Sequence, residues 1–135
     1  MEASLTIQSL REAGLRITPV RKLLVELLQS SEIPLSAREL TSQTRANKTT
    51  IYREIASLLS HGYLTEIDVG ERAKRYELSF RRHHHHLICT ACKSIADIDL
   101  PHDFTRDEQL IATKNKFKVS KHSLEFFGTC GNCRK

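Results

Sequence analysis

The chain contains no tryptophan, few aromatic residues and no long apolar run, and each absence excludes a class of protein. Aromatic residues make up only 6% of its 135 residues, which argues against recognition of RNA or single strands by stacking. No apolar run approaches the roughly 18 residues that a membrane-spanning helix requires. The start lacks the basic segment and apolar core of a secretory signal, so we expect a cytoplasmic protein that does not contact membranes.

Cysteine and histidine are confined almost entirely to one part of the chain. The first 80 residues contain no cysteine and one histidine, whereas the remainder contains all four cysteines and six histidines. This shift in composition predicts two domains, residues 1–80 and 81–135. The formal net charge is +5, which is compatible with binding to nucleic acid but does not by itself establish it.

The first half carries three signals for the start of a helix. Thr18 before Pro19 places a capping hydroxyl ahead of a proline at the first helical position. Ser36 and Glu39 have the spacing of a capping box, and Asn47 is a suitable cap for a further helix. Together with a short helix that begins near Leu5, these signals predict a bundle of four helices.

A hairpin is predicted to follow these helices. The strand-like runs 63–69 and 74–79 are separated by a turn at 70–72. Helices followed by a two-stranded hairpin are typical of a winged helix-turn-helix, in which the helix from Asn47 to about His61 would be the recognition helix. Its outward side chains are of types that contact phosphates and base edges, namely Lys48, Thr49, Thr50, Tyr52 and Arg53. A second stretch without acidic residues holds Arg16, Arg21 and Lys22; the alternative for both stretches is an ordinary solvated helix face.

The second half has a mixed pattern. Residues 95–100 alternate apolar and acidic side chains, as an exposed strand does. Residues 103–115 predict a helix with Phe104, Leu110 and Ile111 facing inward, and residues 117–127 predict another strand. The fold class is therefore α+β.

The four cysteines form two C-x-x-C pairs separated by 37 residues. The pairs are Cys89 with Cys92 and Cys130 with Cys133. Each two-residue spacer allows a tight turn that directs both thiolates at one ion, and two such turns predict a tetrahedral structural zinc site. Disulfides are disfavoured in the expected compartment, and a thioredoxin-like motif would require a β-α-β pattern that this sequence lacks.

Four consecutive histidines, His83 to His86, precede Cys89. In an extended strand His83 and His85 would face one way and His84 and His86 the other, so each face would offer a pair of imidazoles to a metal. Glu77, Asp97 and His122 are among the further donors. Nitrogen and carboxylate donors suit Fe²⁺, Mn²⁺, Zn²⁺ or Ni²⁺.

Three segments together resemble the ferric uptake regulator (Fur) family. They are Thr-Thr-Ile-Tyr-Arg-Glu-Ile, then His-His-His-His-Leu-Ile-Cys-Thr-Ala-Cys, then His-Ser-Leu-Glu-Phe-Phe-Gly-Thr-Cys-Gly-Asn-Cys. The resemblance extends from Gly14 to Cys133. It implies a dimeric, metal-sensing transcriptional repressor with an N-terminal winged helix and a small C-terminal α/β dimerisation domain.

The resemblance also implies roles for particular positions. The four cysteines match the structural zinc site, and Arg16, Tyr52 and Arg53 match positions that contact the operator. The hinge sensor site maps onto Glu77, His84, His86 and Asp97. A second metal site maps onto His83, His85, a position near Phe104, and His122.

Two positions depart from the family pattern. Pro34 stands where the winged-helix domain usually donates a histidine to the hinge metal, and Phe104 stands where the second site usually has a glutamate. Asp97 is similar to the aspartate of the peroxide-sensing branch, but that branch also relies on the histidine that Pro34 replaces. We therefore do not assign peroxide sensing to this chain, and it stays an alternative.

These features together predict a metal-responsive repressor that controls metal homeostasis, with iron as the favoured metal. We expect a homodimer that binds an A/T-rich inverted repeat in double-stranded DNA. Alternatives within the family are sensors of zinc, manganese or peroxide, and a zinc protein with metal-independent DNA binding. An enzyme is not expected, because the phosphate-binding loop, the His-Glu-x-x-His helix and the Ser/His/Asp arrangement are all missing. A zinc adaptor or metal-storage protein is a further alternative.

Overall fold

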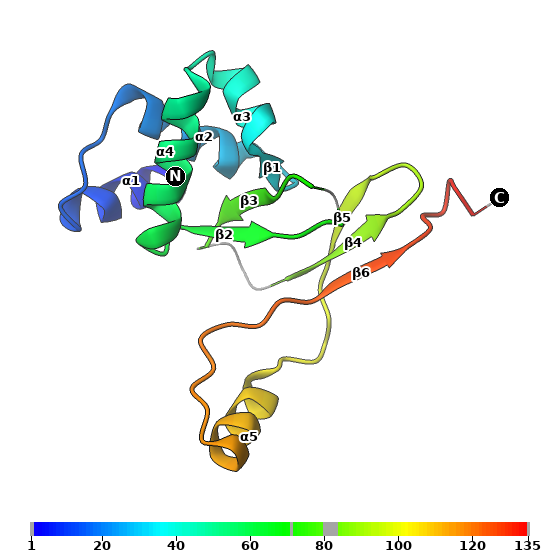
Figure 1. Ribbon diagram of the computed structural model, residues 1–135. Helices are drawn as coiled ribbons and strands as arrows, with labels where there is room; N and C mark the ends of the chain where they lie inside the picture. Colours follow the sequence, from blue (N-terminus) through cyan, green and yellow to red (C-terminus); the bar gives the residue numbers. More distant parts are fainter. Residues whose placement is uncertain (1, 71, 80–83, 135) are drawn as a thin grey trace. The chain divides into compact units, whose positions relative to one another are not determined.

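The computed structural model describes residues 2–70, 72–79 and 84–134, and the chain divides into two compact units, Met1–Arg81 and Arg82–Lys135 (Figure 1). The first unit contains α1 (Glu2–Glu12), α2 (Pro19–Ser30), β1 (Leu35–Ser36), α3 (Ala37–Thr44), α4 (Lys48–Ser60), β2 (Leu64–Ile67) and β3 (Arg75–Leu78). The second unit contains β4 (His85–Cys89), β5 (Ile95–Ile98), α5 (Thr105–Asn115) and β6 (Glu125–Gly128). The first unit combines four helices with a three-stranded sheet, and the second combines one helix with another three-stranded sheet, over the residues described.

The helices of the first unit begin where their sequence signals predict. The Thr18 hydroxyl accepts a hydrogen bond from the backbone N–H of Arg21, with Pro19 at the first helical position of α2. Ser36 and Glu39 form the capping box of α3, and the Asn47 side chain accepts a hydrogen bond from the Thr49 N–H at the start of α4. These side chains satisfy backbone donors that a helix leaves unpaired at its N-terminus.

The hairpin of β2 and β3 follows α4, which confirms the winged helix-turn-helix. Leu64 pairs with Leu78 and Ile67 with Arg75 in antiparallel register. The short strand β1, which the sequence did not reveal, adds to the other edge of β3. Behind the sheet, the four helices share one core whose fully buried side chains include Leu10, Leu24, Leu40, Ile51, Leu58 and Leu78.

The sheet of the second unit has the order β5-β4-β6. Strand β4 is antiparallel to β5 and parallel to β6. Side chains alternate along β4, so that His86 and Ile88 lie on one face while His85, Leu87 and Cys89 lie on the other. The register places Asp97 and Glu125 on either side of His86.

Two predictions for the second unit are wrong in part. The strand predicted over residues 117–127 is confined to β6 (Glu125–Gly128), and residues 117–124 have no regular structure. The helix α5 exists, but it has no buried residue: Leu110 is 64% exposed and Ile111 42%. Among residues 84–134 the buried hydrophobic side chains are only Ile88 and Cys89. A unit with so small a core needs another source of stability.

Candidate metal centres and nucleic-acid interface

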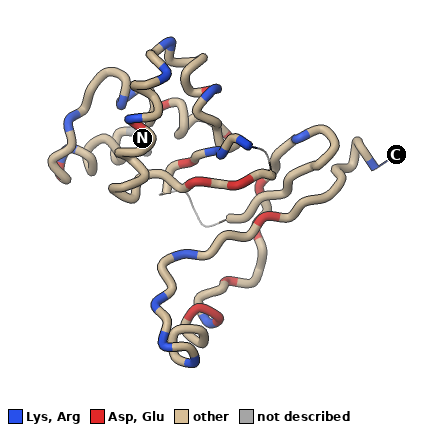
Figure 2. Tube along the Cα trace, in the orientation of Figure 1, with Lys and Arg blue, Asp and Glu red and all other residues tan. Residues whose placement is uncertain are grey.

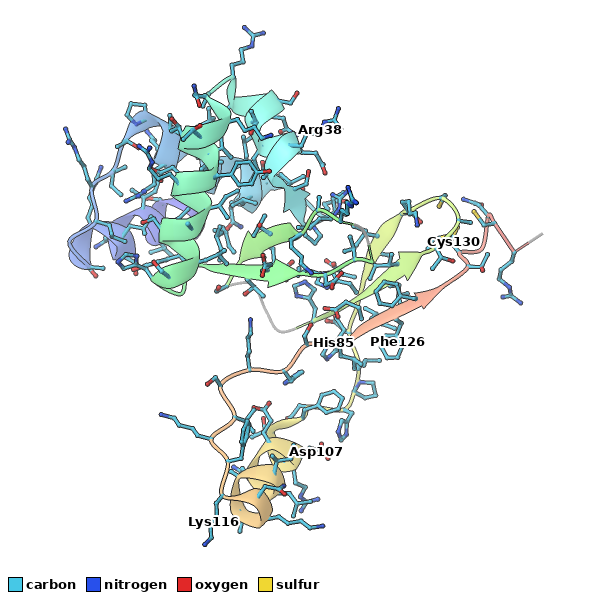
Figure 3. The ribbon with its side chains drawn as sticks, in the orientation of Figure 1. Arg38, His85, Asp107, Lys116, Phe126 and Cys130 are labelled. Carbon is cyan, nitrogen blue, oxygen red and sulfur yellow. The ribbon has the colours of Figure 1, made fainter. Side chains whose placement is uncertain are left out.

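The sheet of the second unit brings the two cysteine pairs together at one end. Cys89 is the last residue of β4 and pairs with Gly128 of β6, two residues before Cys130. Cys92 lies in the turn after β4, where Lys93 adopts a left-handed conformation with φ of 66°. Figure 3 shows Cys130 at this end of the sheet, and His85 at the opposite end, toward α5.

The geometry of these four residues, the cysteine cluster, fits a zinc ion. The four sulfur atoms all lie within 4.8 Å of one another. The Sγ atoms of Cys92 and Cys130 are 3.8 Å apart. Tetrahedral zinc with Zn–S bonds of about 2.3 Å places its sulfur ligands about 3.8 Å apart. The spacing therefore matches a four-thiolate zinc centre.

Backbone donors prepare one of these thiols for a metal. The N–H groups of Cys92 and Cys130 donate to the Cys89 sulfur at 3.5 and 3.4 Å, and they lower the pKa of Cys89 to about 6. Hydrogen bonding of the Cys133 thiol to the sulfurs of Cys130, Cys92 and Cys89 raises the pKa of Cys133 to about 12. The first thiol therefore ionises readily, whereas the last keeps its proton until a cation replaces it.

Three predicted sensor residues meet on one face of the same sheet. His84 Nε2 and His86 Nε2 are 3.2 Å apart. An oxygen of Asp97 lies 3.6 Å from His86 Nε2 and 3.8 Å from His84 Nε2. We call these three residues the regulatory cluster. The register explains their convergence, because Asp97 pairs directly with His86 across β4 and β5. Two imidazole nitrogens and a carboxylate oxygen at these spacings form a donor set suited to a divalent ion.

The other two hinge positions belong to the first unit. Glu77 is buried on β3, where it pairs with Thr65. Pro34 is fully buried. Its carbonyl accepts a hydrogen bond of 3.1 Å from Arg75 Nη1, and the same guanidinium nitrogen lies 2.7 Å from Glu39. Pro34 is therefore a fixed structural residue, and its side chain has no donor atom for a metal.

The predicted second metal site has a different character. His83 lies outside the described residues. His85 and His122 lie near each other, with ring centroids 5.6 Å apart, but Phe104 packs against both, at 5.8 Å from His85 and 5.0 Å from His122. The carboxylate beside His122 is that of Glu108, whose Oε1 lies 2.9 Å from His122 Nδ1. Sequence reasoning missed Glu108, although it lies one helical turn after Phe104.

Helix α4 presents the predicted nucleic-acid contacts in the first unit. Ile51, Ile55 and Leu58 are buried, whereas the exposed face carries Lys48, Tyr52 and Arg53, with Thr50 half-buried. The Lys48 ammonium lies 5.8 Å from the centre of the Tyr52 ring. Arg16 is exposed in the loop before α2. Figure 2 shows basic residues along the helices and loops of this unit, while acidic ones mark strands β2 and β3.

Arg21 does not belong to this exposed set. Only 8% of the residue is exposed, and its Nε lies 2.6 Å from Glu54 of α4. Its two other nitrogens donate to the Arg16 carbonyl at 3.0 Å and to the Ser57 hydroxyl at 3.4 Å. The sequence held a signal for this, since Arg21 starts the i, i+3, i+4, i+7 series that buries α2.

A winged helix-turn-helix and a four-cysteine centre together define a class of metal-binding regulatory protein. The model of the ferric uptake regulator family matches residues 12–127. The chain belongs to this family. No helix in the described ranges has the length and apolar character needed to cross a membrane.

The relatives are named as regulators rather than as enzymes. The ferric uptake regulation protein of Campylobacter jejuni is 30% identical over 131 residues, covering 92% of this chain and 83% of that protein. The peroxide operon regulator of Bacillus subtilis is 31% identical over 134 residues, covering 96% of this chain and 91% of that protein. This chain is accordingly a regulator of the metal-responsive type.

Solved structures share the fold over nearly the whole chain. The Vibrio cholerae ferric uptake regulator is 29% identical with a TM-score of 0.73, covering 91% of this chain and 98% of that one. The Helicobacter pylori ferric uptake regulator, described as having three functional metal-binding sites, is 23% identical with a TM-score of 0.76, covering 98% and 91%. Other structures with this fold are described with iron or with manganese.

Proposed function

We propose that this chain is a metal-dependent, sequence-specific DNA-binding repressor that controls metal homeostasis, with Fe²⁺ as its regulatory ion. The observation that carries this proposal is the regulatory cluster, in which His84, His86 and Asp97 direct their donor atoms toward one another on one sheet face. The cysteine cluster supplies a separate, structural site. A chain with one site of each kind can keep its fold while the second ion comes and goes.

We propose that Glu77 completes the regulatory site. Three of its four ligands then belong to the second unit, while Glu77 lies on β3, within the wing of the first. A bound divalent ion supplies the positive charge that two imidazoles and two carboxylates can share. Engagement of Glu77 would restrict the orientations of the winged-helix unit, which carries the DNA-binding residues. Because Pro34 provides no ligand, Glu77 is the only family position in the first unit that can serve this role.

The DNA-binding residues of this proposal are exposed side chains of the first unit, namely Arg16, Lys48, Thr50, Tyr52 and Arg53. Arg53 and Lys48 supply charge for phosphates or base edges, and Tyr52 and Thr50 supply hydroxyl groups. In a homodimer, two copies of α4 would meet the half-sites of an A/T-rich inverted repeat at a fixed spacing. Metal-dependent coupling of about 1–3 kcal/mol would change the affinity for DNA about 5–150-fold.

The identity of the regulatory ion rests on chemistry that several metals share. Imidazole and carboxylate donors accept Fe²⁺, Mn²⁺ and Zn²⁺, so zinc and manganese sensing are the alternatives within this proposal. Peroxide sensing is the alternative that the Bacillus subtilis relative raises, and Asp97 favours it. Pro34 argues against it, because the peroxide-sensing branch relies on a histidine at that position.

The proposal can be tested with His86→Ala and a matched histidine variant, His102→Ala. His102 lies in the same unit but contacts Asp107 instead of the regulatory cluster. We expect metal to tighten binding of the wild-type protein and of His102→Ala to a labelled inverted repeat, measured by fluorescence anisotropy. His86→Ala should show no response while retaining one zinc per chain. The assay is run with Fe²⁺ under anaerobic conditions, and then with Mn²⁺ and with Zn²⁺.

Each contrary result has its own meaning. A normal metal response of His86→Ala would refute the ligand assignment. Equal affinity of the wild-type protein for DNA with and without each ion would instead indicate a zinc protein that binds DNA independently of metal. Loss of DNA binding after brief peroxide treatment of the Fe²⁺-loaded protein would indicate peroxide sensing.

A further inference from the structure

Among the described residues, helix α5 contacts the rest of its unit through its first turns. None of its residues is buried. The contacts of its first turns join a histidine to a carboxylate: His102 Nε2 lies 2.8 Å from Asp107, and His122 Nδ1 lies 2.9 Å from Glu108. Ordinary core packing therefore does not hold α5 in place within the described part of the unit.

A group of rings lies at this end of the helix. Phe104, the residue before α5, packs edge-on against His85 of β4 and against His102, with ring centroids 5.8 and 4.5 Å apart. Its ring is tilted against that of His122, with centroids 5.0 Å apart. We call His85, His102, Phe104 and His122 the Phe104 cluster. These separations and angles are those of favourable aromatic pairs. The phenyl ring is the member that touches all three imidazoles.

The described residues around Phe104 do not bring three donor atoms as close together as the cysteine cluster does. A phenyl ring offers no lone pair where the family pattern has a carboxylate. His85, Glu108 and His122 are also not among the described groups of three donor atoms that lie within 4.8 Å of one another, whereas the four cysteines are. The Glu108 carboxylate is hydrogen-bonded to His122 Nδ1 at 2.9 Å. This arrangement suits a hydrogen-bonded pair packed beside a ring.

We propose that the Phe104 cluster replaces the second metal site of the family, so that α5 is anchored to the sheet by aromatic packing and the His122–Glu108 pair without a metal. The chain would then bind two metal ions, one at the cysteine cluster and one at the regulatory cluster. Phe104 would lower the number of bound ions by one, whether or not the regulatory cluster binds a metal.

The test is to restore the missing carboxylate. Wild-type protein, Phe104→Glu, Phe104→Leu and the double variant Phe104→Glu/His122→Ala are saturated with Mn²⁺ or Zn²⁺, freed of loosely bound ions by gel filtration, and analysed for metal by plasma mass spectrometry. We expect Phe104→Glu to bind one ion more per chain than the wild type. Phe104→Leu and the double variant should match the wild type. Phe104→His, which keeps a flat ring and adds a donor, serves if the glutamate variant loses its cysteine-bound zinc.

Two outcomes would overturn the proposal. One is a wild-type protein that binds a third ion which Glu108→Gln or His122→Ala removes, because Glu108 would then be a ligand. The other is no additional ion in either folded ligand-bearing variant. If instead the regulatory site fails, the wild type binds one ion and Phe104→Glu binds two. Phe104→Glu then still binds one ion more than the wild type, so failure of the regulatory site can be told apart from failure of this proposal.

Anchoring of α5 is tested by hydrogen exchange on the zinc-loaded protein. We expect Phe104→Ala to accelerate amide exchange across residues 105–115, and a mild chelator that removes only the regulatory ion to leave it unchanged. Equal acceleration by the chelator in the wild type would show that a metal holds the helix, against the proposal.

Discussion

The ion pair of Arg21 and Glu54 allows a sharp prediction about the first unit. The side chains are only 10% and 15% exposed, and the Nε–Oε2 distance is 2.6 Å. Arg21→Met removes the charge and all three side-chain hydrogen bonds but keeps much of the apolar stem. It leaves the Glu54 carboxylate without its partner in a nearly dry environment.

The magnitude follows from the burial of both groups. Removing one partner of a buried pair costs about 3–5 kcal/mol, and we expect the lower end because each side chain retains slight contact with water. For a domain of this size, a loss of about 3 kcal/mol lowers the melting temperature by roughly 12–24 °C. The double variant Arg21→Met/Glu54→Leu should recover to within about 1 kcal/mol of the wild type, because neither charge then remains buried.

The assay is urea unfolding of the zinc-loaded chain followed by circular dichroism, together with DNA binding at several salt concentrations. Arg38→Met is the control, since Arg38 is an exposed arginine of α3. If Arg21→Met costs less than 1 kcal/mol but reduces the salt dependence of DNA binding as an exposed contact would, Arg21 contacts phosphate and the structural interpretation is refuted.

Three further predictions concern the other parts of the molecule. Zinc affinity should weaken at least tenfold per pH unit on acidification near neutrality, because Cys133, with a pKa of about 12, must lose its proton to bind; a chromogenic chelator measures this, and pH-independent retention of zinc would contradict it. Ser36→Ala, which removes the capping box of α3, should cost about 1 kcal/mol in urea unfolding, and an unchanged midpoint would show that the cap contributes nothing. Arg53→Ala should weaken DNA binding: equally for all sequences where Arg53 contacts a phosphate, and with lost preference at one base pair where it contacts a base. An unchanged affinity and an unchanged salt dependence would show that Arg53 does not contact DNA.

The sequence predicted the first unit well because its signals are local. A cap such as Thr18, Ser36 or Asn47 acts within three residues of itself, and the buried face of a helix repeats over a short window. The parallel pairing of β4 with β6 was beyond such signals, since it joins residues 39 positions apart, as in His86 with Glu125. It depends on the topology of the whole unit.

The errors in the second unit have a related cause. An apolar pattern indicates that Leu110 and Ile111 favour a buried position. It cannot show that the described residues of their own unit leave both side chains exposed. Phe117 and Val119 alternate like a strand, yet no neighbouring strand offers hydrogen bonds to that segment in the described sheet. The spacing of the two C-x-x-C pairs was enough to predict that the cysteines share one site. The roles of Glu108 and Arg21 could not be predicted in this way, because they depend on their partners His122 and Glu54.

Strand β4 carries one residue of each candidate metal site, His86 of the regulatory cluster and Cys89 of the cysteine cluster. His86 and Cys89 are three residues apart along it, which corresponds to about 10 Å in an extended strand. Loss of the ion held by the thiolates would fray β4 from its Cys89 end and loosen the imidazoles on the same strand. Under the proposed function, acid, an oxidant or zinc starvation would therefore abolish the metal response even when the regulatory ion is abundant, because the response would require zinc and reduced thiols at the cysteine cluster.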